Sequence, residues 1–293
     1  KFLRVMLTDE ATLSQLVRVR SWAAATASGD LGDAPQVEDH VVPLITSTKD
    51  NCLGSSCSKF DTCPLYRARK KAQKADIVVV NHHLLFADLS LKDDSLISVL
   101  PEVEAIVVDE AHQVPDIARQ FFGTSVSARR FGDLIRDLRG ELSLLGNDDP
   151  TLLNRITQLE DIINIMIGSI LAGNADYGQW FDCGGKSIVE EVDHSLAELC
   201  ESLRIASERS QGLDNGRRRV EKIADDFVLL TEPANLDEYV HWIDRSQSGF
   251  TVHLSPIDVS QTIGRLISHG AWVFCSATLC VDGTFSHIRR ALG

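Results

Sequence analysis

The sequence predicts an α/β fold in which a parallel sheet is interrupted by a long helical insertion. Three short runs are rich in valine and isoleucine without polar alternation, at residues 76–80, 105–108 and 271–274. Such runs are typical of interior strands of a parallel sheet, which are covered on both faces. The stretch between the second and third runs has a different texture, because its apolar residues repeat at helical spacing.

The insertion is predicted to contain helices and a β-hairpin. One apolar stripe steps alternately by four and three residues, through Leu152, Ile156, Leu159, Ile163, Met166 and Ile170. A second stripe passes through Val189, Val192, Leu196, Leu199 and Leu203. A third helix is expected to start after "NGRRRVEKIADDF" (215–227). The alternating segments "YVHWID" and "FTVHLSPID", joined by "RSQSG", predict the hairpin.

The overall composition indicates a globular intracellular protein. The chain has 293 residues, of which 44% are apolar, which is ample for one large domain or about two to three smaller ones. It begins at Lys1, not Met, so we expect a piece of a longer protein. No apolar run is long enough to span a membrane, and no membrane partner is expected. Seven cysteines, without the density of a secreted disulfide scaffold, indicate a reducing, cytoplasmic location.

The charge balance restricts how the chain can bind nucleic acid. A net charge of −13 argues against a protein that coats nucleic acid with its whole surface, so affinity for phosphates needs a local basic face. The segment "CPLYRARKKAQKAD" offers one, as a predicted helix whose basic side chains include Arg67, Lys70 and Lys71. It follows a helical start at 11–28 and an irregular loop. Taken alone, a charge run of this kind is more often a solvated face.

Three cysteines form a tight group in a polar loop, and four others are scattered. Cys52, Cys57 and Cys63 are separated by four and five residues, which is looser than the C-x-x-C knuckles of most structural zinc sites. They could hold an iron–sulphur cluster, zinc with a partner such as His40, or be ordinary thiols. The scattered cysteines are predicted to be small buried hydrophobes; they are Cys183, Cys200, Cys275 and Cys280.

Two adjacent acids follow the predicted strand at 105–108. Asp109 and Glu110 would lie at the carboxyl end of a parallel strand, where α/β sheets place their ligands. In an ATPase of the P-loop type, the aspartate at such a position holds Mg²⁺ and a neighbouring glutamate polarises the attacking water. The pair alone often only solvates a strand end. Ala111 and His112, which follow it, make the ATPase interpretation much more specific.

The sequence contains no phosphate-binding loop of the form G-x-x-x-x-G-K-[ST]. The stretch "CGGKS" supplies the last three characters with Gly185, Lys186 and Ser187. Trp180 stands where the first glycine is needed, no apolar strand precedes the stretch, and it follows the acids instead of preceding them. We therefore expect a phosphate-binding loop to lie upstream of Lys1.

Polar side chains at two other predicted strand ends are further candidates. Asn81 and His82 follow the run at 76–80, and because successive strand residues point to opposite faces, at most one of His82 and His83 is expected to meet a ligand or DNA. Ser276 and Thr278 follow the run at 271–274. Their hydroxyls could hydrogen-bond the two carboxylates or His112, although a Ser-Ala-Thr sequence by itself is a weak motif.

Taken together, these motifs resemble the DinG/XPD group of superfamily 2 helicases, and its bacterial DinG/YoaA branch in particular. The matches occur in the expected order: "CLGSSCSKFDTCPLYRARKKAQKADIVVVNHHLLFADL", "VVDEAH", "HWIDRSQSGFTVHLSPIDV" and "AWVFCSATL". They extend from about residue 51 to 292 and are weakest in the helical insertion. The cysteine spacing followed by "NHHLL" is highly specific, and favours an iron–sulphur cluster over zinc.

The resemblance implies a fold and an activity. Members are ATP-driven helicases that move 5′ to 3′ along single-stranded DNA, with a 4Fe–4S domain and a helical arch inserted in the first of two RecA-like motor domains. The implied fold is a partial RecA-like parallel-sheet motor domain with an iron–sulphur domain and a mainly α-helical arch. The implied division is 1–75 (cluster domain), 76–115 (motor, first part), 116–249 (arch) and 250–293 (return to the motor). A nucleoid-associated role in DNA repair is expected.

The resemblance also assigns residues. Cys52, Cys57 and Cys63 match three cluster ligands. Asp109 and Glu110 match the Mg²⁺ and water-activating acids, while the residues that match elements coupling ATP to movement are His112, Ser276 and Thr278. The candidate contacts to single-stranded DNA are Arg67, Lys70, Lys71, Asn81 and His82.

The departures from the family define what to expect of this chain by itself. No cysteine precedes Cys52 to match the family's first cluster ligand, and neither a phosphate loop nor a second motor domain is present. We therefore expect the isolated chain not to hydrolyse ATP and its cluster to be labile. The alternative is a non-enzymatic DNA- or protein-binding module, possibly stabilised by zinc. A strand and phosphate loop in the upstream coding sequence would favour the helicase.

Overall fold

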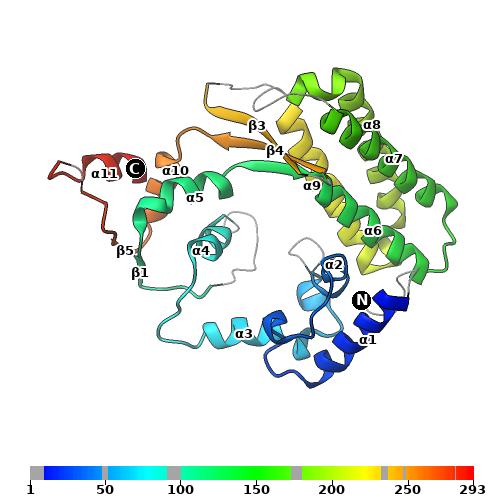
Figure 1. Ribbon diagram of the computed structural model, residues 1–293, viewed down its shortest axis with the longest axis horizontal. Helices are drawn as coiled ribbons and strands as arrows, with labels where there is room; N and C mark the ends of the chain where they lie inside the picture. The colour runs from blue at the N-terminus through cyan, green and yellow to red at the C-terminus, as the bar shows by residue number, and fades with distance from the viewer. Residues whose placement is uncertain are drawn as a thin grey trace.

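The structure is a computed structural model that describes residues 10–47, 52–90, 100–172, 180–231, 237–246, 249–280 and 282–293, without the side chains of 180–186. Figure 1 shows the chain arranged as a ring, with the N-terminal segment along the bottom, a small parallel sheet at one side and a bundle of long helices at the other. In the described part, no helix is both long and apolar enough to cross a bilayer.

The parallel sheet is built from two strands that are far apart in sequence. β1 (Ala105–Val108) pairs with β5 (Ala271–Phe274), so that Val107 lies opposite Val273. Around them pack α4 (His82–Leu89), α5 (Val114–Phe121), α10 (Ser260–Ile267) and α11 (Ser286–Leu292). Their shared core, the motor core, includes Phe86, Val108, Val114, Ile263 and Ile288. The predicted α/β class with a parallel sheet is confirmed, as expected of a partial RecA-like domain.

The predicted first strand is wrong. Residues 77–80 form no strand and have no strand partner among the described residues, and the chain then turns into α4. The side chains of Ile77 and Val79 are 83% and 91% exposed. An apolar run becomes an interior strand only where neighbouring strands pair with its backbone. Here Val80 alone in this run packs against the motor core.

The helical insertion folds as a bundle with its own core, which we call the arch. Its helices are α6 (Ala128–Leu144), α7 (Pro150–Ala172), α8 (Trp180–Ala206) and α9 (Gln211–Thr231). Every residue of the stripe predicted between Leu152 and Ile170 is at most 3% exposed, because the stripe faces the neighbouring helices. The third helix begins earlier than predicted, at Gln211, so the segment 215–227 lies inside it.

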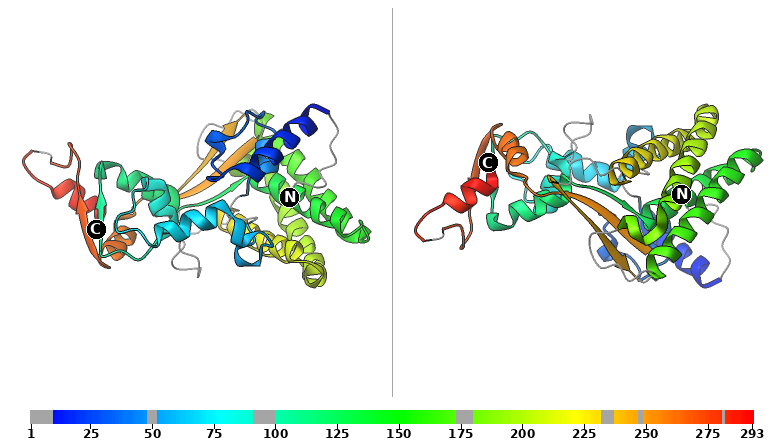
Figure 2. Two further views of the ribbon diagram at one scale, coloured as in Figure 1. Left: turned by 90° about the horizontal axis from the view of Figure 1, so that it is seen from below. Right: turned by 90° about the horizontal axis from the view of Figure 1, so that it is seen from above.

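The predicted hairpin is present and joins the two parts of the molecule. β3 (Tyr239–Ser246) and β4 (Gly249–Pro256) pair antiparallel, and β2 (Thr124–Ser127) pairs with the other edge of β4. Figure 2 shows these strands reaching from the side of the parallel sheet to the arch helices. Side chains on one face of this sheet, including Val126, Ile243 and Val252, belong to the arch core.

The placement of this sheet bears on the expected domain boundaries. A boundary between residues 249 and 250 would separate β3 from β4, which share eight paired positions and one core. All but the first two residues of α5 lie within the predicted arch, yet its buried residues Ile117 and Ala118 belong to the motor core. We therefore propose an arch that extends from about β2 to the end of β4.

The N-terminal segment is tied together by polar contacts. It contains α1 (Glu10–Ala25), α2 (Val42–Ile45) and the basic helix α3 (Pro64–Ala72). The Gln15 side chain accepts from the Glu38 backbone N–H at 2.8 Å and donates to the Glu38 carboxylate at 3.1 Å. Gly29 has φ +69°, and a Cβ there would lie 2.5 Å from the ring of Pro64, so the loop needs glycine at this position.

Candidate functional site

The two acids lie where β1 ends, in a turn with an unusual backbone. Asp109 accepts a hydrogen bond at its Oδ1 from the Glu110 backbone N–H, at 3.0 Å. Glu110 has φ 46° and ψ 42°, in the left-handed region that residues other than glycine rarely adopt. The chain then enters a short 3-10 turn, Ala111–Gln113, whose first N–H donates to the Cys275 carbonyl at 2.9 Å. Non-glycine residues in this conformation cluster at functional sites.

Residues from the end of β5 complete a hydrogen-bonded group with the second acid, which we call the acid turn: Asp109, Glu110, His112, Ser276 and Thr278. The Ser276 hydroxyl lies 2.8 Å from His112 Nδ1 and donates to Glu110 Oε2 at 3.2 Å. His112 Nδ1 also lies 3.2 Å from Glu110 Oε2, and the Thr278 hydroxyl lies 3.4 Å from that of Ser276. The contact expected between the hydroxyls and His112 or the carboxylates is therefore present.

The acid turn has the chemistry of a magnesium–nucleotide site. Both carboxylates are exposed at the carboxyl end of a parallel strand, open to a ligand. Among the residues that the structure describes, no three His, Cys, Asp or Glu side chains gather to form a complete metal cage. Mg²⁺ does not require one, because it is usually held by one or two carboxylates, waters and the substrate's phosphates. Asp109 and Glu110 fit that mode of binding.

The stretch that resembles the end of a phosphate-binding loop is not part of this site, as predicted. The "CGGKS" stretch (183–187) lies within α8 of the arch, so its backbone is helical and cannot form a phosphate-cradling loop.

The structure places Asn81 and His82 differently from the sequence prediction. Asn81 is the N-cap of α4, and its side-chain oxygen accepts from the Leu84 N–H at 2.8 Å. His82 is half-buried, with Nε2 2.7 Å from the carbonyl oxygen of Asp109. Nothing in the sequence indicated this contact between residues 27 positions apart. Asn before a helix is a recognisable capping signal, which the expectation of a strand concealed.

The three clustered cysteines lie in one loop, and two of them occupy equivalent positions. Cys57 and Cys63 each follow a short 3-10 turn, Gly54–Ser56 and Phe60–Thr62, and Cys63 also precedes α3. Cys52 is exposed and the other two thiols are half-buried. In the described parts of the chain, they do not converge on a metal position. The structure therefore supplies three thiolate donors in one loop but not an assembled cluster site.

The zinc alternative with His40 gains no support. His40 Nε2 lies 2.9 Å from the Thr12 hydroxyl, and its Nδ1 lies 3.3 Å from the Glu38 carboxylate. Both ring nitrogens are thus engaged within the N-terminal segment.

The prediction that the scattered cysteines are buried is wrong for Cys275 and Cys280, which are exposed because they follow the end of the sheet. Cys200 is half-buried, and the side chain of Cys183 lies outside the described residues.

The basic helix α3 presents cations to solvent. Arg67, Lys70 and Lys71 are all exposed. The Lys70 ammonium lies 5.9 Å from the centre of the Tyr66 ring, and Arg67 donates to the Ala27 carbonyl at 3.4 Å. The two lysines are therefore available to an anion, whereas Arg67 also holds the N-terminal loop.

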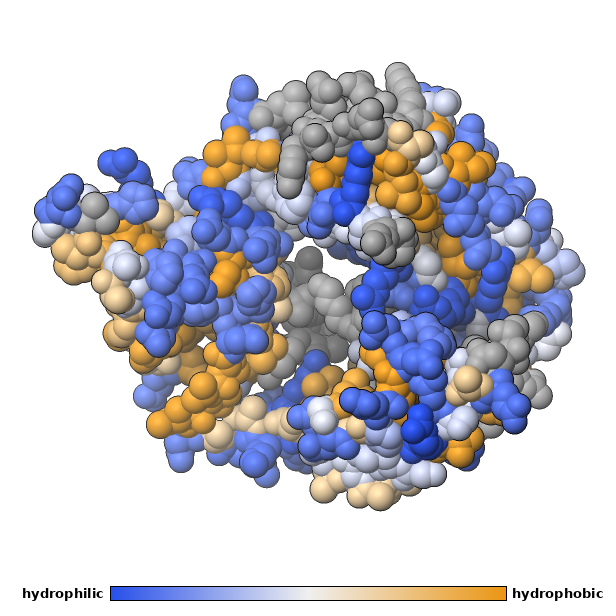
Figure 3. Space-filling model, viewed as in Figure 1, coloured by the Kyte–Doolittle hydropathy of each residue, from blue (hydrophilic) through white to orange (hydrophobic). Residues whose placement is uncertain are grey.

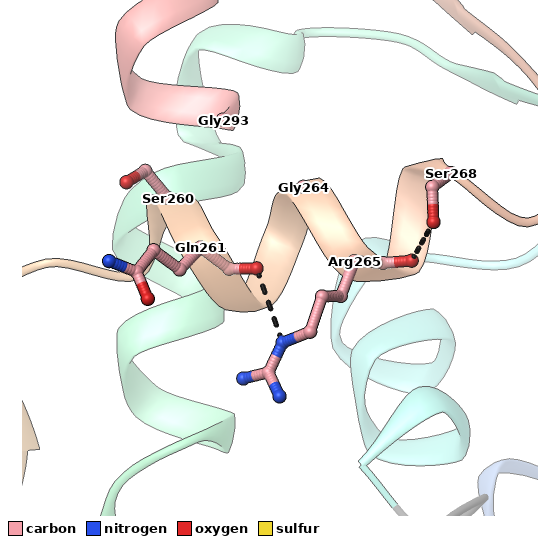
Figure 4. Close-up of a pocket in the computed structure, with 6 residues that line it drawn as sticks. All are labelled: Ser260, Gln261, Gly264, Arg265, Ser268 and Gly293. Atoms are coloured by element: carbon pink, nitrogen blue, oxygen red, sulfur yellow. Dashed lines mark hydrogen bonds between the residues drawn. The ribbon is translucent and has the colours of Figure 1, made fainter.

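Two hollows lie outside the acid turn. Figure 4 shows a shallow depression along α10, where Arg265 donates to the Gln261 carbonyl; its lining residues are Ser260, Gln261, Gly264, Arg265, Ser268 and Gly293. None of the acid turn lines it. Figure 3 shows an opening near the centre of the ring, whose rim includes hydrophilic side chains.

Comparison with known proteins connects these features. The family model DEAD_2 matches residues 36–131, which contain the cysteine loop, α3, α4 and the acids. The chain is 35% identical to the ATP-dependent DNA helicase YoaA of Haemophilus influenzae, over 98% of this chain and 46% of that relative. The corresponding values for YoaA of Escherichia coli are 33%, 96% and 45%. For the ATP-dependent DNA helicase DinG of Photobacterium profundum they are 25%, 88% and 43%.

The matches to the YoaA relatives include both the acid turn and the arch, since they cover nearly all of this chain. The chain spans about half the length of the curated relatives it matches. In its DEAD_2 match and its near-complete alignment to these relatives, the chain is similar to the DinG/YoaA group of helicase sequences.

Proposed function

We propose that this chain is part of an ATP-dependent DNA helicase that moves 5′ to 3′ along single-stranded DNA in DNA repair. The observation that carries the proposal is the acid turn, in which residues 164 positions apart form one hydrogen-bonded group at the ends of two parallel strands. The names of the relatives support an ATP-dependent activity on DNA.

Each member of the acid turn has a role in this proposal. Asp109 would hold Mg²⁺ on the nucleotide, and Glu110 would polarise the attacking water. Ser276 contacts both Glu110 and His112, so a change at the nucleotide alters the hydrogen bonds between β1 and β5. His112, Ser276 and Thr278 would thereby couple hydrolysis to movement of neighbouring elements.

DNA-stimulated ATP hydrolysis by the full-length protein tests this function directly. The isolated 293-residue chain is proposed to be inactive, because its sequence has no phosphate-binding loop and transition-state charge would be left uncompensated. Hydrolysis at a comparable rate by both proteins would contradict that part. No DNA-stimulated hydrolysis by the full-length protein would instead favour a DNA- or protein-binding module.

The exposed lysines of α3 are proposed to bind the phosphates of single-stranded DNA. Replacing Lys70 and Lys71 with alanine should weaken DNA binding and reduce the slope of log K against log salt by about 1.4, because each phosphate contact on a single strand contributes about 0.7. Arg67 is left in place, since its guanidinium also holds Ala27. The measurement is the salt dependence of DNA affinity by fluorescence anisotropy, on the full-length protein.

A matched control removes two exposed arginines elsewhere. Arg289 and Arg290 of α11 carry the same total charge, and their replacement should leave the slope unchanged. An unchanged slope in the lysine variant, or an equal change in both variants, would reject α3 as a specific phosphate-binding surface.

A 4Fe–4S cluster held in part by Cys52, Cys57 and Cys63 is proposed on the chemistry of the donors. Three thiolates in a polar loop suit iron–sulphur ligation, and a further ligand must come from elsewhere in the protein. The expected result is a brown full-length protein with an anaerobic visible absorption band and matched amounts of iron and acid-labile sulphide. Replacing Cys57 with serine should remove both, whereas the same change at exposed Cys280 should not. A colourless protein that contains zinc or no metal would contradict the cluster.

A further inference from the structure

We propose that His82 is a positioning residue for ATP hydrolysis, which clamps the peptide between Asp109 and Glu110 and so aims the Glu110 carboxylate. This inference rests on the proposed function and specifies how its acid turn is held.

The contact itself is unambiguous in direction. His82 Nε2 lies 2.7 Å from the carbonyl oxygen of Asp109. A carbonyl oxygen can only accept, so Nε2 carries the proton and donates. The ring belongs to the first residue of α4, whose start is fixed by the Asn81 cap. The donor is therefore presented by a helix end that packs through Leu85 and Phe86 into the motor core.

The clamped peptide is the one that needs support. Glu110 follows it in the left-handed conformation, which is unfavourable for a residue with a side chain and persists only where surrounding contacts enforce it. On the far side of Glu110, the Ala111 N–H donates to the Cys275 carbonyl at 2.9 Å. On the near side, His82 holds the Asp109 carbonyl. Glu110 thus lies between two peptides that are each fixed from another element.

Loss of the His82 contact should affect the chemical step more than binding. In the proposed mechanism Glu110 polarises water in the transition state, whereas Mg²⁺–nucleotide binding depends mainly on Asp109 and on phosphate contacts. An interaction made only in the transition state lowers kcat without raising KM for ATP. His82 also lies at the end of the segment that follows α3, so it connects the proposed DNA-binding helix to the acid turn.

The experiment compares two substitutions of similar shape. His82→Gln keeps an N–H donor the same number of bonds from the backbone, while His82→Met has a similar length and no donor. His83→Met is the control, because His83 is exposed and packs edge-on against Phe121 instead of contacting the acid turn. In the full-length protein, His82→Met should lower DNA-stimulated kcat by about 10- to 100-fold, the usual effect of losing a supporting hydrogen bond in a metal site. His82→Gln should recover most of it, with KM for ATP and DNA affinity unchanged in both.

A second measurement does not depend on activity. Hydrogen exchange of the peptide 105–113 should be faster in His82→Met than in the unsubstituted protein, and near normal in His82→Gln. Equal exchange in the two variants would overturn the clamp, even if the full-length protein proved to have no ATPase activity and the proposed function failed. Weaker DNA binding with normal kcat at saturating DNA would also overturn it, and would make His82 a DNA contact.

Discussion

Replacing Glu110 with glutamine is expected to lower DNA-stimulated ATP hydrolysis by the full-length protein by about 10²- to 10⁴-fold, the usual contribution of a general base. Glutamine keeps the length of the side chain and an oxygen that can accept from Ser276, whose hydroxyl donates to Glu110 Oε2 at 3.2 Å. The substitution therefore removes the negative charge that polarises water and little else. ATP binding and DNA binding should persist, because Asp109 and α3 are unchanged.

The matched control is Glu104→Gln. Glu104 directly precedes β1 at its opposite end and is exposed, so it undergoes the same change of charge away from the acid turn. Its variant should hydrolyse ATP at the normal rate. Steady-state hydrolysis with saturating DNA measures both variants, and filter binding measures ATP affinity. If Glu110→Gln retained nearly full activity, the role of Glu110 as the base would be wrong and the acid turn would be a structural network.

Much of the acid turn was predictable because of a general property of parallel sheets. Two apolar runs separated by more than 150 residues were each followed by polar side chains. Parallel neighbours end at the same edge, so Ser276 and His112 could be expected to meet. The structure places them 2.8 Å apart. The left-handed backbone of Glu110 and the clamp from His82 carry no such pattern, because they arise from tertiary contacts.

The strand predicted at residues 76–80 shows the limit of composition. Its valines and isoleucine match those of β1, yet Ile77 and Val79 are almost fully exposed, while Val108 is 2% exposed. Local sequence reports a preference for extended backbone, but pairing depends on which segments are neighbours in space. The helix predicted from the apolar stripe between Leu152 and Ile170 is confirmed for the opposite reason. Its backbone hydrogen bonds and its apolar face both arise from residues close together in sequence.

The arch should lose much of its stability when Phe131 is replaced by alanine. Phe131 of α6 is fully buried, and its ring meets that of Phe227 on α9 edge-on, with centroids 6.4 Å apart. Removing a buried phenylalanine typically costs about 3–5 kcal/mol in transfer and cavity terms. The same substitution at Phe285, which is 51% exposed, should stay within about 0.5 kcal/mol. Hydrogen exchange and denaturant unfolding compare the two variants.

The regions that lose hydrogen-exchange protection in Phe131→Ala show whether the arch is an independent folding unit. The arch core and the motor core share no residue, but β2 follows α5 directly and β4 leads toward α10. Within the arch, Arg130 joins the sheet to the helices, since it donates to the Ser125 carbonyl of β2 and to Asp226 of α9. If the sheet only tethers the arch, Phe131→Ala should expose amides of α6 to α9 while those of β1, α5 and β5 stay protected. Equal loss of protection in both regions would show that the sheet couples the two cores into one cooperative unit. Movement of the arch could not then be independent of the acid turn.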